Sequence, residues 1–383
     1  MKPLTLFFNQ FFKSEKAGGI SIIFCTIFSL WISNSNYGES YLHFWDIHFA
    51  GHSLQHWIND GLMAIFFLLI GLELEREIYI GELSDLKSAS FPFFAALGGM
   101  IVPACIYLFI NRDTVYTHGF GIPMATDIAF ALAVLSLLGN RIPNSLKVLL
   151  TALAVIDDLG AIIVIAFFYS SSISWIHLAG VAGIWAFLFI LNRKKVNHFL
   201  PYILGGMGMW YLMLSSGVHA TLAGVITAFV IPFDKENSAN ISYKIQAKLH
   251  IPVAYFILPL FALANTAIVF HFDNIGTTYC IGIIAGLLIG KPIGILAFTY
   301  IASKLKWTQL PNDSNWMGIA CISLMASIGF TMSIFITLIA FDTPDLINAS
   351  KLAILVASFA AGLLSYFVST TVFKSSKSSS SID

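Results

Sequence analysis

Long apolar runs separated by short polar connections dominate the chain. A window of about 19 residues, which suits membrane-spanning helices, finds twelve such runs, near residues 17–34, 56–75, 90–110, 119–138, 148–169, 175–192, 199–215, 218–232, 250–270, 278–300, 316–340 and 350–373. About 20 apolar residues are enough to cross a bilayer as a helix. The pattern therefore predicts an all-α polytopic membrane protein with about twelve transmembrane helices.

Composition supports this fold class. Hydrophobic residues make up 57% of the chain and charged residues 10%, whereas ordinary soluble domains carry about 25% charged residues. The 20 Lys and Arg balance the 20 Asp and Glu, so no excess of positive charge favours nucleic acid as a partner. All 4 cysteines lie in apolar segments, where we expect them to pack as small hydrophobic residues rather than bind metal or form disulfides.

The positions of the cations predict the topology, because cytoplasmic loops concentrate Lys and Arg. With the N-terminus inside, 17 of the 20 cations fall on the cytoplasmic side. Arg112 and Lys351 fall outside, and Lys291 lies within a span. This bias predicts an even number of spans with both termini in the cytoplasm.

Two segments outside the predicted spans have distinct character. The external connection 35–55 carries an aromatic and histidine-rich run that could turn at Ala50–Gly51 as a hairpin. Its histidines follow no standard zinc spacing, so we expect a solvated loop and no metal. The serine-rich segment 374–383 is of low complexity, and we expect a disordered cytoplasmic tail.

Hydropathy places four ionisable residues deep in the hydrocarbon: Asp127, Asp157, Asp158 and Lys291. Counted from the cytoplasmic end at ~1.5 Å per residue, all four lie ~15 to 18 Å deep, about halfway through the hydrocarbon. A charged residue there costs roughly 2.5 to 3.5 kcal/mol, so such groups pair, titrate or line a wet cavity. The pattern indicates an ion or proton path. A purely structural Asp–Lys pair is the alternative, but it would neutralise only one of the three carboxylates.

Neighbouring helical residues point about 100° apart, so Asp157 and Asp158 cannot face the same partner. We expect one of them to face Asp127 across a cavity and the other a different neighbour, with Lys291 the only cation at that depth. Carboxylates held close in a low dielectric resist simultaneous ionisation. Na⁺ or Li⁺, which prefer oxygen ligands, can then compete with protons. If one cation displaces two protons, exchange is electrogenic, and the absence of a Walker motif excludes P-loop ATP chemistry.

Two predicted spans, the fourth and the eleventh, are interrupted. Gly121 and Pro123 precede Thr126–Asp127, and Ser327–Thr331 breaks the later span. Broken helices in opposite halves of a chain indicate a transporter site. Spans three to five and ten to twelve run in opposite directions, as inverted repeats require. Glycines recur every four residues from Gly282 to Gly294, which predicts a close helix contact beside Lys291.

These residues resemble the NhaA-type sodium/proton antiporters almost from end to end. The similarity is carried by the motifs Ala125–Leu132, Ala154–Ala161, Ser216–Gly224, Gly286–Pro292 and Ile328–Ser333. It implies twelve helices with two broken, crossing helices and electrogenic, pH-dependent exchange of Na⁺ or Li⁺ for H⁺. It also implies a bacterial inner membrane, no cofactor, and a homodimer formed through the external loop 41–56.

The resemblance also implies roles for the intramembrane residues. Asp158 would be the direct Na⁺ ligand and Asp157 the partner of Lys291. Thr126 and Asp127 would lie where the broken helices cross. There Asp127 would offset the positive helix ends and Lys291 the negative ends.

The family's pH-sensing run matches Glu73, Arg76 and Glu77. Without the resemblance, these residues would be interpreted as a solvated helix end. The family commonly has a Glu–His pair where this chain has Gln246–Ala247, so we expect transport with an unusual activation pH. We expect His219 to be a packed polar residue that tunes the pH response rather than a cation ligand.

Two other functions use similar residues. A passive cation channel could use the same carboxylates without alternating between proton and ion. An intramembrane aspartyl protease would need Tyr-Asp and Gly-x-Gly-Asp, whereas this chain has Thr126–Asp127 and Asp157–Gly160. We therefore predict a single transmembrane transporter domain over residues 1–373 that is not an enzyme.

Overall fold

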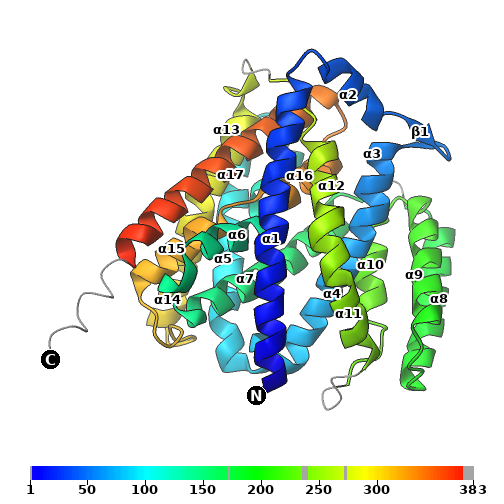
Figure 1. Ribbon diagram of the computed structural model, residues 1–383, viewed down its shortest axis with the longest axis horizontal. Coiled ribbons are helices and arrows are strands. Elements are labelled where there is room, and N and C mark those ends of the chain that lie inside the picture. Colours follow the sequence, from blue (N-terminus) through cyan, green and yellow to red (C-terminus); the bar gives the residue numbers. More distant parts are fainter. Residues whose placement is uncertain (1, 171–172, 235–239, 271–273, 374–383) are drawn as a thin grey trace. The chain divides into compact units, whose positions relative to one another are not determined.

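The structure is a computed structural model that describes residues 2–170, 173–234, 240–270 and 274–373, and most of these residues are helical (Figure 1). The predicted disordered tail, 374–383, lies outside the described residues. The chain divides into two compact units. One comprises residues 1–14, 24–84 and 162–269, and the other residues 15–23, 85–161 and 270–383.

The first unit contains a long helix beside several short ones. Its elements are α1 (Lys2–Ser33, shared with the second unit), α2 (Gly38–Trp45), β1 (His48–Phe49), β2 (His52–Ser53), α3 (Leu54–His56), η1 (Trp57–Leu62), α4 (Met63–Ile80), η2 (Glu82–Ser84), α8 (Trp175–Arg193), α9 (Phe199–Leu214), α10 (Leu222–Ala228), α11 (Ile241–Pro252), η5 (Val253–Ile257) and α12 (Leu258–Asn265). Helices α8 and α9 lie side by side, green in Figure 1. Helix α10 packs closely on α4. The contact leaves no room for a side chain at Gly224, where a Cβ would lie 2.1 Å from the carbonyl oxygen of Ala64.

The strands β1 and β2 form the hairpin that the sequence suggested. They pair antiparallel, with His48 opposite Ser53 and Phe49 opposite His52. The turn has positive φ at Ala50 (50°) and Gly51 (88°), as a two-residue hairpin loop of this hand requires. The indole of Trp57 donates a 2.8 Å hydrogen bond to the carbonyl of Phe49 and so ties the hairpin to η1.

The second unit contains both interrupted helices. Its elements are α5 (Leu86–Asn111), η3 (Val115–Met124), α6 (Ile128–Leu137), η4 (Gly139–Arg141), α7 (Asn144–Phe168, in this unit up to Ala161), α13 (Thr278–Ala285), η7 (Gly286–Gly290), α14 (Lys291–Lys304), α15 (Trp316–Ala326), α16 (Phe330–Ala340) and α17 (Pro344–Val372). The predicted glycine face packs against α5. A Cβ on Gly294 would lie 2.1 Å from the carbonyl oxygen of Gly98, and the reverse distance is also 2.1 Å, so neither position can hold a larger residue at this spacing.

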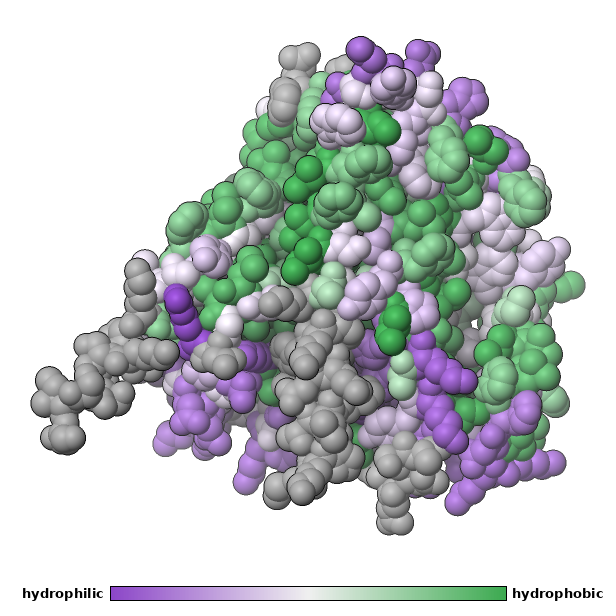
Figure 2. All heavy atoms as spheres, in the orientation of Figure 1, coloured by the Kyte–Doolittle hydropathy of each residue, from purple (hydrophilic) through white to green (hydrophobic). Residues whose placement is uncertain are grey.

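The helices are long and apolar enough to make this a multi-pass membrane protein. Among the described residues, seven helices pass the length and hydropathy criteria for a span, and nine do if each bent pair counts as one span. Two shorter apolar helices cover Ala17–Ser33 and Phe199–Leu214. Figure 2 shows apolar side chains, in green, over much of the displayed surface. The exposed apolar residues of the protein include Phe187 and Ile190.

Some span boundaries differ from the hydropathy prediction. Lys351 was expected in an external connection, but α17 begins at Pro344, and Lys351 is only 3% exposed within it. Similarly, the segment predicted to begin at residue 250 belongs to a helix that begins at Ile241. In both places the first helical turns are too polar for an apolar window to include them.

Candidate functional site

Two helix breaks lie in contact within the second unit. The chain bends by 43° between η3 and α6 and by 47° between α15 and α16, so the predicted broken helices are confirmed. Pro123 cannot donate a backbone hydrogen bond, and residues Ala125 and Asp127 have extended backbones. The amide of Asp127 donates a 2.7 Å hydrogen bond to the carbonyl of Ile328 in the other break.

The Asp127 carboxylate serves the first turns of two helices. Its Oδ1 accepts a 2.9 Å hydrogen bond from the amide of Phe130, which makes Asp127 the N-cap of α6. Its Oδ2 accepts a 2.9 Å bond from the amide of Thr331, in the first turn of α16, and another from the Thr331 hydroxyl. Because helix N-termini carry partial positive charge, this buried carboxylate lies where two such ends converge.

Lys291 lies at the start of α14, directly after the π-helical turn η7. Its side chain is completely buried, and its Nζ lies 2.7 Å from Oδ2 of Asp157, also completely buried. The same Nζ donates a short hydrogen bond to the carbonyl of Met124, the last residue of η3. Lys291 therefore contacts both a carboxylate and the negative end of a broken helix.

Thr126 connects Asp157 to the second break. Its Oγ1 lies 2.6 Å from Oδ2 of Asp157 and 2.9 Å from the carbonyl oxygen of Ala326, the last residue of α15. A hydroxyl has one proton to donate. It can donate to an ionised Asp157, or it can accept from a protonated Asp157 while donating to Ala326. The direction of this contact therefore depends on the proton of Asp157.

Asp158 follows Asp157 on α7 and is 1% exposed. It interacts electrostatically with Lys291, although Asp157 makes the close contact. The structure thus brings Thr126, Asp127, Asp157 and Lys291 together through the two breaks, with Asp158 adjoining. Oδ1 of Asp157 has no hydrogen-bond partner among the described residues.

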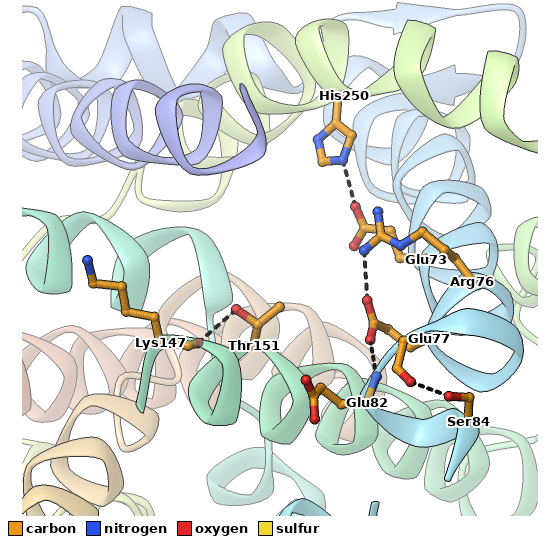
Figure 3. A network of polar contacts seen from close by, with 9 residues as sticks. Glu73, Arg76, Glu77, Glu82, Ser84, Lys147, Thr151 and His250 are labelled. Atoms are coloured by element: carbon orange, nitrogen blue, oxygen red, sulfur yellow. Dashed lines mark hydrogen bonds and ion pairs between the residues drawn. The ribbon is translucent and has the colours of Figure 1, made fainter. Parts of the chain in front are cut away.

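A second group of ionisable residues lies at the end of α4, in the first unit (Figure 3). Oε1 of Glu73 lies 2.9 Å from Nε2 of His250, and Glu73 is only 5% exposed. Nη2 of Arg76 lies 2.9 Å from Oε1 of Glu77, whose other oxygen accepts a 3.2 Å bond from the amide of Glu82. The interpretation as a solvated helix end is therefore wrong, because Glu73 is buried and paired with His250 of α11, a contact that a local pattern does not reveal.

In the sequence, Glu82 lies in the short connection between the candidate spans Leu54–Ile80 and Lys87–Asn111. Partial burial and the neighbouring Glu77 carboxylate raise the pKa of Glu82. His219 lies elsewhere in the first unit. It is half-buried, and its Nε2 lies 3.1 Å from the carbonyl oxygen of Tyr169. The contacts described for His219 do not include Glu73, Arg76 or Glu77.

Sequence reasoning did not assign roles to three residues that the structure brings into these groups: Thr331, His250 and Glu75. Thr331 lies in the first helical turn after the second break, and its amide bonds Asp127 in the first break. A search for polar residues in that turn could have found it. Glu75, 6% exposed, contacts the hydroxyl of Ser242 at 3.3 Å. Within the described part of the chain, no group of three or more His, Cys, Asp or Glu could hold a metal ion.

Comparison with known proteins gives a consistent result. The profile of the family described as Na⁺/H⁺ antiporter 1 matches residues 9–369. The chain is 57% identical over 375 residues to the Na(+)/H(+) antiporter NhaA of Flavobacterium psychrophilum, covering 97% of both chains. It is 57% identical over 364 residues to that of Cytophaga hutchinsonii, covering 94% of both. It is 52% identical over 366 residues to that of Dechloromonas aromatica, again covering 94% of both.

Proposed function

Because the chain belongs to the Na⁺/H⁺ antiporter 1 family, and is therefore a Na⁺/H⁺ antiporter and not an enzyme, we propose that the exchange takes place at the buried carboxylates of the second unit. Asp157 and Asp158 bind either protons or Na⁺, with Asp158 as the direct Na⁺ ligand. Li⁺, another small hard cation that prefers oxygen ligands, is a second substrate. Thr126 and Asp127 complete the site, and no cofactor takes part.

One observation carries this proposal. Three carboxylates lie in the second unit with at most 2% exposure, and the single ammonium in contact with them among the described residues is Lys291. Buried charges without partners are costly, so the excess carboxylate charge is neutralised by protons or by a metal ion. Exchange requires that the same carboxylate oxygens bind protons at one time and a metal ion at another.

Asp127 and Lys291 compensate the partial charges of the helix ends at the proposed site. Asp127 stabilises the positive ends of α6 and α16, and Lys291 stabilises the negative end of η3. Na⁺ bound beside Asp157 repels the ammonium group of Lys291. The site therefore binds either Na⁺ or protons, and not both at the same time. If two protons replace one Na⁺, each cycle moves one net charge, and a membrane potential that is negative inside drives Na⁺ out.

We further propose a membrane topology for the chain, with about twelve transmembrane helices and both termini in the cytoplasm. The seven to nine candidate spans, the two shorter apolar helices and the segment around α10 form about twelve transmembrane helices, and residues 1–373 form one transporter domain. The two broken helices belong to inverted repeats. Both termini lie in the cytoplasm of a bacterial cell, and the protein lies in the inner membrane.

The hairpin is the proposed homodimer contact. Within the loop 41–56, Phe49 is 72% exposed and Ile47 is 52% exposed. Apolar side chains on an external loop gain from burial against another protein surface. A second copy of the chain, paired through the same loop, supplies that surface.

We propose that the group at the end of α4 sets the pH response. Glu73, Arg76 and Glu77 lie in paired, mostly buried positions, and His219 adds a titratable ring at a separate place in the same unit. Because Gln246 and Ala247 replace a titratable pair, activation occurs at a pH different from that of relatives with Glu and His there.

Sealed everted vesicles with a pH-sensitive dye test the proposed exchange. With a proton gradient established, added Na⁺ or Li⁺ should dissipate the gradient, and Asp158→Asn should abolish the response. Asp157→Asn and Lys291→Ala should reduce it strongly. Asp342→Asn, which removes an exposed carboxylate, is the matched control and should behave like the parent protein.

The two alternative functions predict other outcomes. A passive cation channel would let Na⁺ cross without dissipating the proton gradient, and a protease would give no ion response. Na⁺ uptake that leaves the gradient intact, or full coupling in Asp158→Asn, would show that these carboxylates do not perform the exchange.

A further inference from the structure

Lys351 is a second buried ammonium in the second unit, and no polar contact within the fold accounts for it. Its side chain is 3% exposed, and it forms no hydrogen bond or ion pair with the described residues. Lys291, by contrast, contacts Asp157. Because a buried charge without a partner is costly, an ionisable side chain of this kind within a span is a candidate functional group.

Helix α17 places Lys351 at a defined distance from the crossing of the broken helices. The hydroxyl of Ser358 accepts a 3.1 Å hydrogen bond from the amide of Phe330, the first residue of α16. The next amide, that of Thr331, bonds Asp127. Ser358 therefore marks the level of the crossing on α17. Lys351 comes two helical turns earlier on the same buried face, which is ~10 Å along the helix axis.

The helices around Lys351 provide no counter-charge. The elements that pack most closely on α17 are α6, α13, α15, α16 and η7, and these five described elements contain no Asp or Glu. Their titratable side chains are Tyr279, Cys280 and Cys321. Asp342 and Asp345, near the start of α17, are exposed to solvent, and Tyr366 lies beyond Ser358. The charge of Lys351 is therefore not cancelled by a neighbouring carboxylate.

The buried charges of the second unit balance when one Na⁺ is bound. Among the described residues, its buried Asp, Glu, Lys and Arg side chains are three carboxylates and two ammoniums: Asp127, Asp157, Asp158, Lys291 and Lys351. With all of them ionised, they carry one net negative charge, which a single Na⁺ neutralises. Two protons on the carboxylates instead leave one net positive charge. Without Lys351, the doubly protonated form would be the neutral one.

We propose that Lys351 is a specificity-determining residue that favours Na⁺ over protons at the site through its charge, without contacting either. Its ammonium repels each positive charge that enters the site. Because two protons bring twice the charge of one Na⁺, this repulsion disfavours the doubly protonated form more than the Na⁺-bound form. The inference rests on the proposed exchange of one Na⁺ for two protons, and it adds a residue that lies away from the carboxylates.

The size of the effect follows from the distance. Two unit charges ~10 Å apart, at an effective dielectric constant of about 20, change a binding constant by roughly tenfold. A neutral side chain in place of Lys351 should therefore strengthen Na⁺ binding by about fivefold to tenfold. It should strengthen the binding of two protons by the square of that factor, because the repulsion is removed for each proton.

Binding calorimetry of the purified protein over a pH series tests this inference. In alkaline solution, where few protons compete, Lys351→Met should lower the dissociation constant for Na⁺ by about fivefold to tenfold. In acidic solution, where two protons occupy the carboxylates, the same variant should raise the apparent dissociation constant by a similar factor, because the gain in proton binding exceeds the gain in Na⁺ binding. Lys351→Gln, which is also neutral, should give both shifts. Lys304→Met removes an exposed lysine of the same unit. It is the matched control and should change neither value.

Opposite shifts at the two ends of the pH series would support the inference, because general damage to the fold would weaken Na⁺ binding at every pH. Shifts in one direction only, constants that match the parent protein, or different shifts in Lys351→Met and Lys351→Gln would overturn it. A parent protein whose dissociation constant for Na⁺ does not depend on pH would refute the proposed function and this inference together. If the parent constant does depend on pH and the two neutral variants fail to give opposite shifts, the inference alone is refuted.

Discussion

The ion pair between Lys291 and Asp157 gives the sharpest quantitative expectation. Both side chains are completely buried and their charged atoms are 2.7 Å apart. Removing one partner of a buried pair costs roughly 3 to 5 kcal/mol, because the other charge remains without compensation. Replacing both by neutral groups of similar size is often nearly neutral. Lys291→Met and Asp157→Asn should therefore each destabilise the protein, and the double variant should recover most of the loss.

Thermal unfolding of the detergent-solubilised protein, followed by tryptophan fluorescence at one heating rate, measures this effect. For domains of 150–250 residues, about 1 kcal/mol shifts the midpoint by about 2 to 4 °C. Each single variant should thus unfold at least ~6 °C below the parent protein. The measurement belongs at pH 8, where a proton is least available to neutralise the carboxylate left by Lys291→Met.

The double-mutant cycle distinguishes pairing from general damage to the core. If the two groups interact as the geometry indicates, the coupling free energy should be roughly 3 kcal/mol or more. Arg at position 291 is a poor control, because its planar group does not fit a site built around one ammonium. Additive losses in Lys291→Met and Asp157→Asn would refute the pairing, and so would a double variant that is less stable than either single variant.

Three further changes test other contacts. Thr331→Val removes the hydroxyl that bonds Asp127 but keeps the backbone amide bond, so the unfolding midpoint should fall by the equivalent of about 1.5 to 3 kcal/mol, whereas Thr331→Ser should stay near the parent value. Lys351 is 3% exposed, with no hydrogen bond or ion pair among the described residues, so Lys351→Met should raise the midpoint; a lower midpoint would show that the ammonium is compensated. The pKa of Glu82 is raised in the folded protein, so the ionised carboxylate destabilises the fold at a pH above the ordinary pKa of glutamate. Glu82→Gln should therefore raise the unfolding midpoint slightly at pH 8 and leave it unchanged at pH 4. A shift of the same size at both pH values would contradict this expectation.

The intramembrane site was predictable because burying charge in hydrocarbon is so costly that few residues can be there without a purpose. Counting depth from the cytoplasmic ends indicated that Asp127, Asp157 and Lys291 lie at one level, and the structure joins Lys291 to Asp157 directly. The interruptions near Pro123 and Gly329 were equally visible, since proline and glycine weaken helices locally. These signals are local, and they survive without knowledge of the tertiary fold.

The group at the end of α4 was not predictable in the same way. Glu73 and Glu75 occur in a charged run that would suit a solvated helix end, and only contacts with α11 explain why both are buried. The start of α11 was also missed, because Ser242 and Gln246 give its first turns a polar composition although both side chains are buried. A hydropathy window averages over the helix and does not identify which face a polar residue occupies.

The two breaks create helix ends in the middle of the second unit, and side chains compensate them unequally. Asp127 bonds the beginnings of α6 and α16, whereas the ends of η3 and α15 depend on Lys291 and Thr126. Both Lys291 and Thr126 also contact Asp157. In the proposed exchange, a change of proton or cation at Asp157 alters the partners of both backbone ends, whereas the hydrogen bonds described for Asp127 do not involve Asp157. In the proposed exchange, Asp127 acts as the fixed point of the crossing, and the ends of η3 and α15 are where ion loading can be converted into movement of the helices.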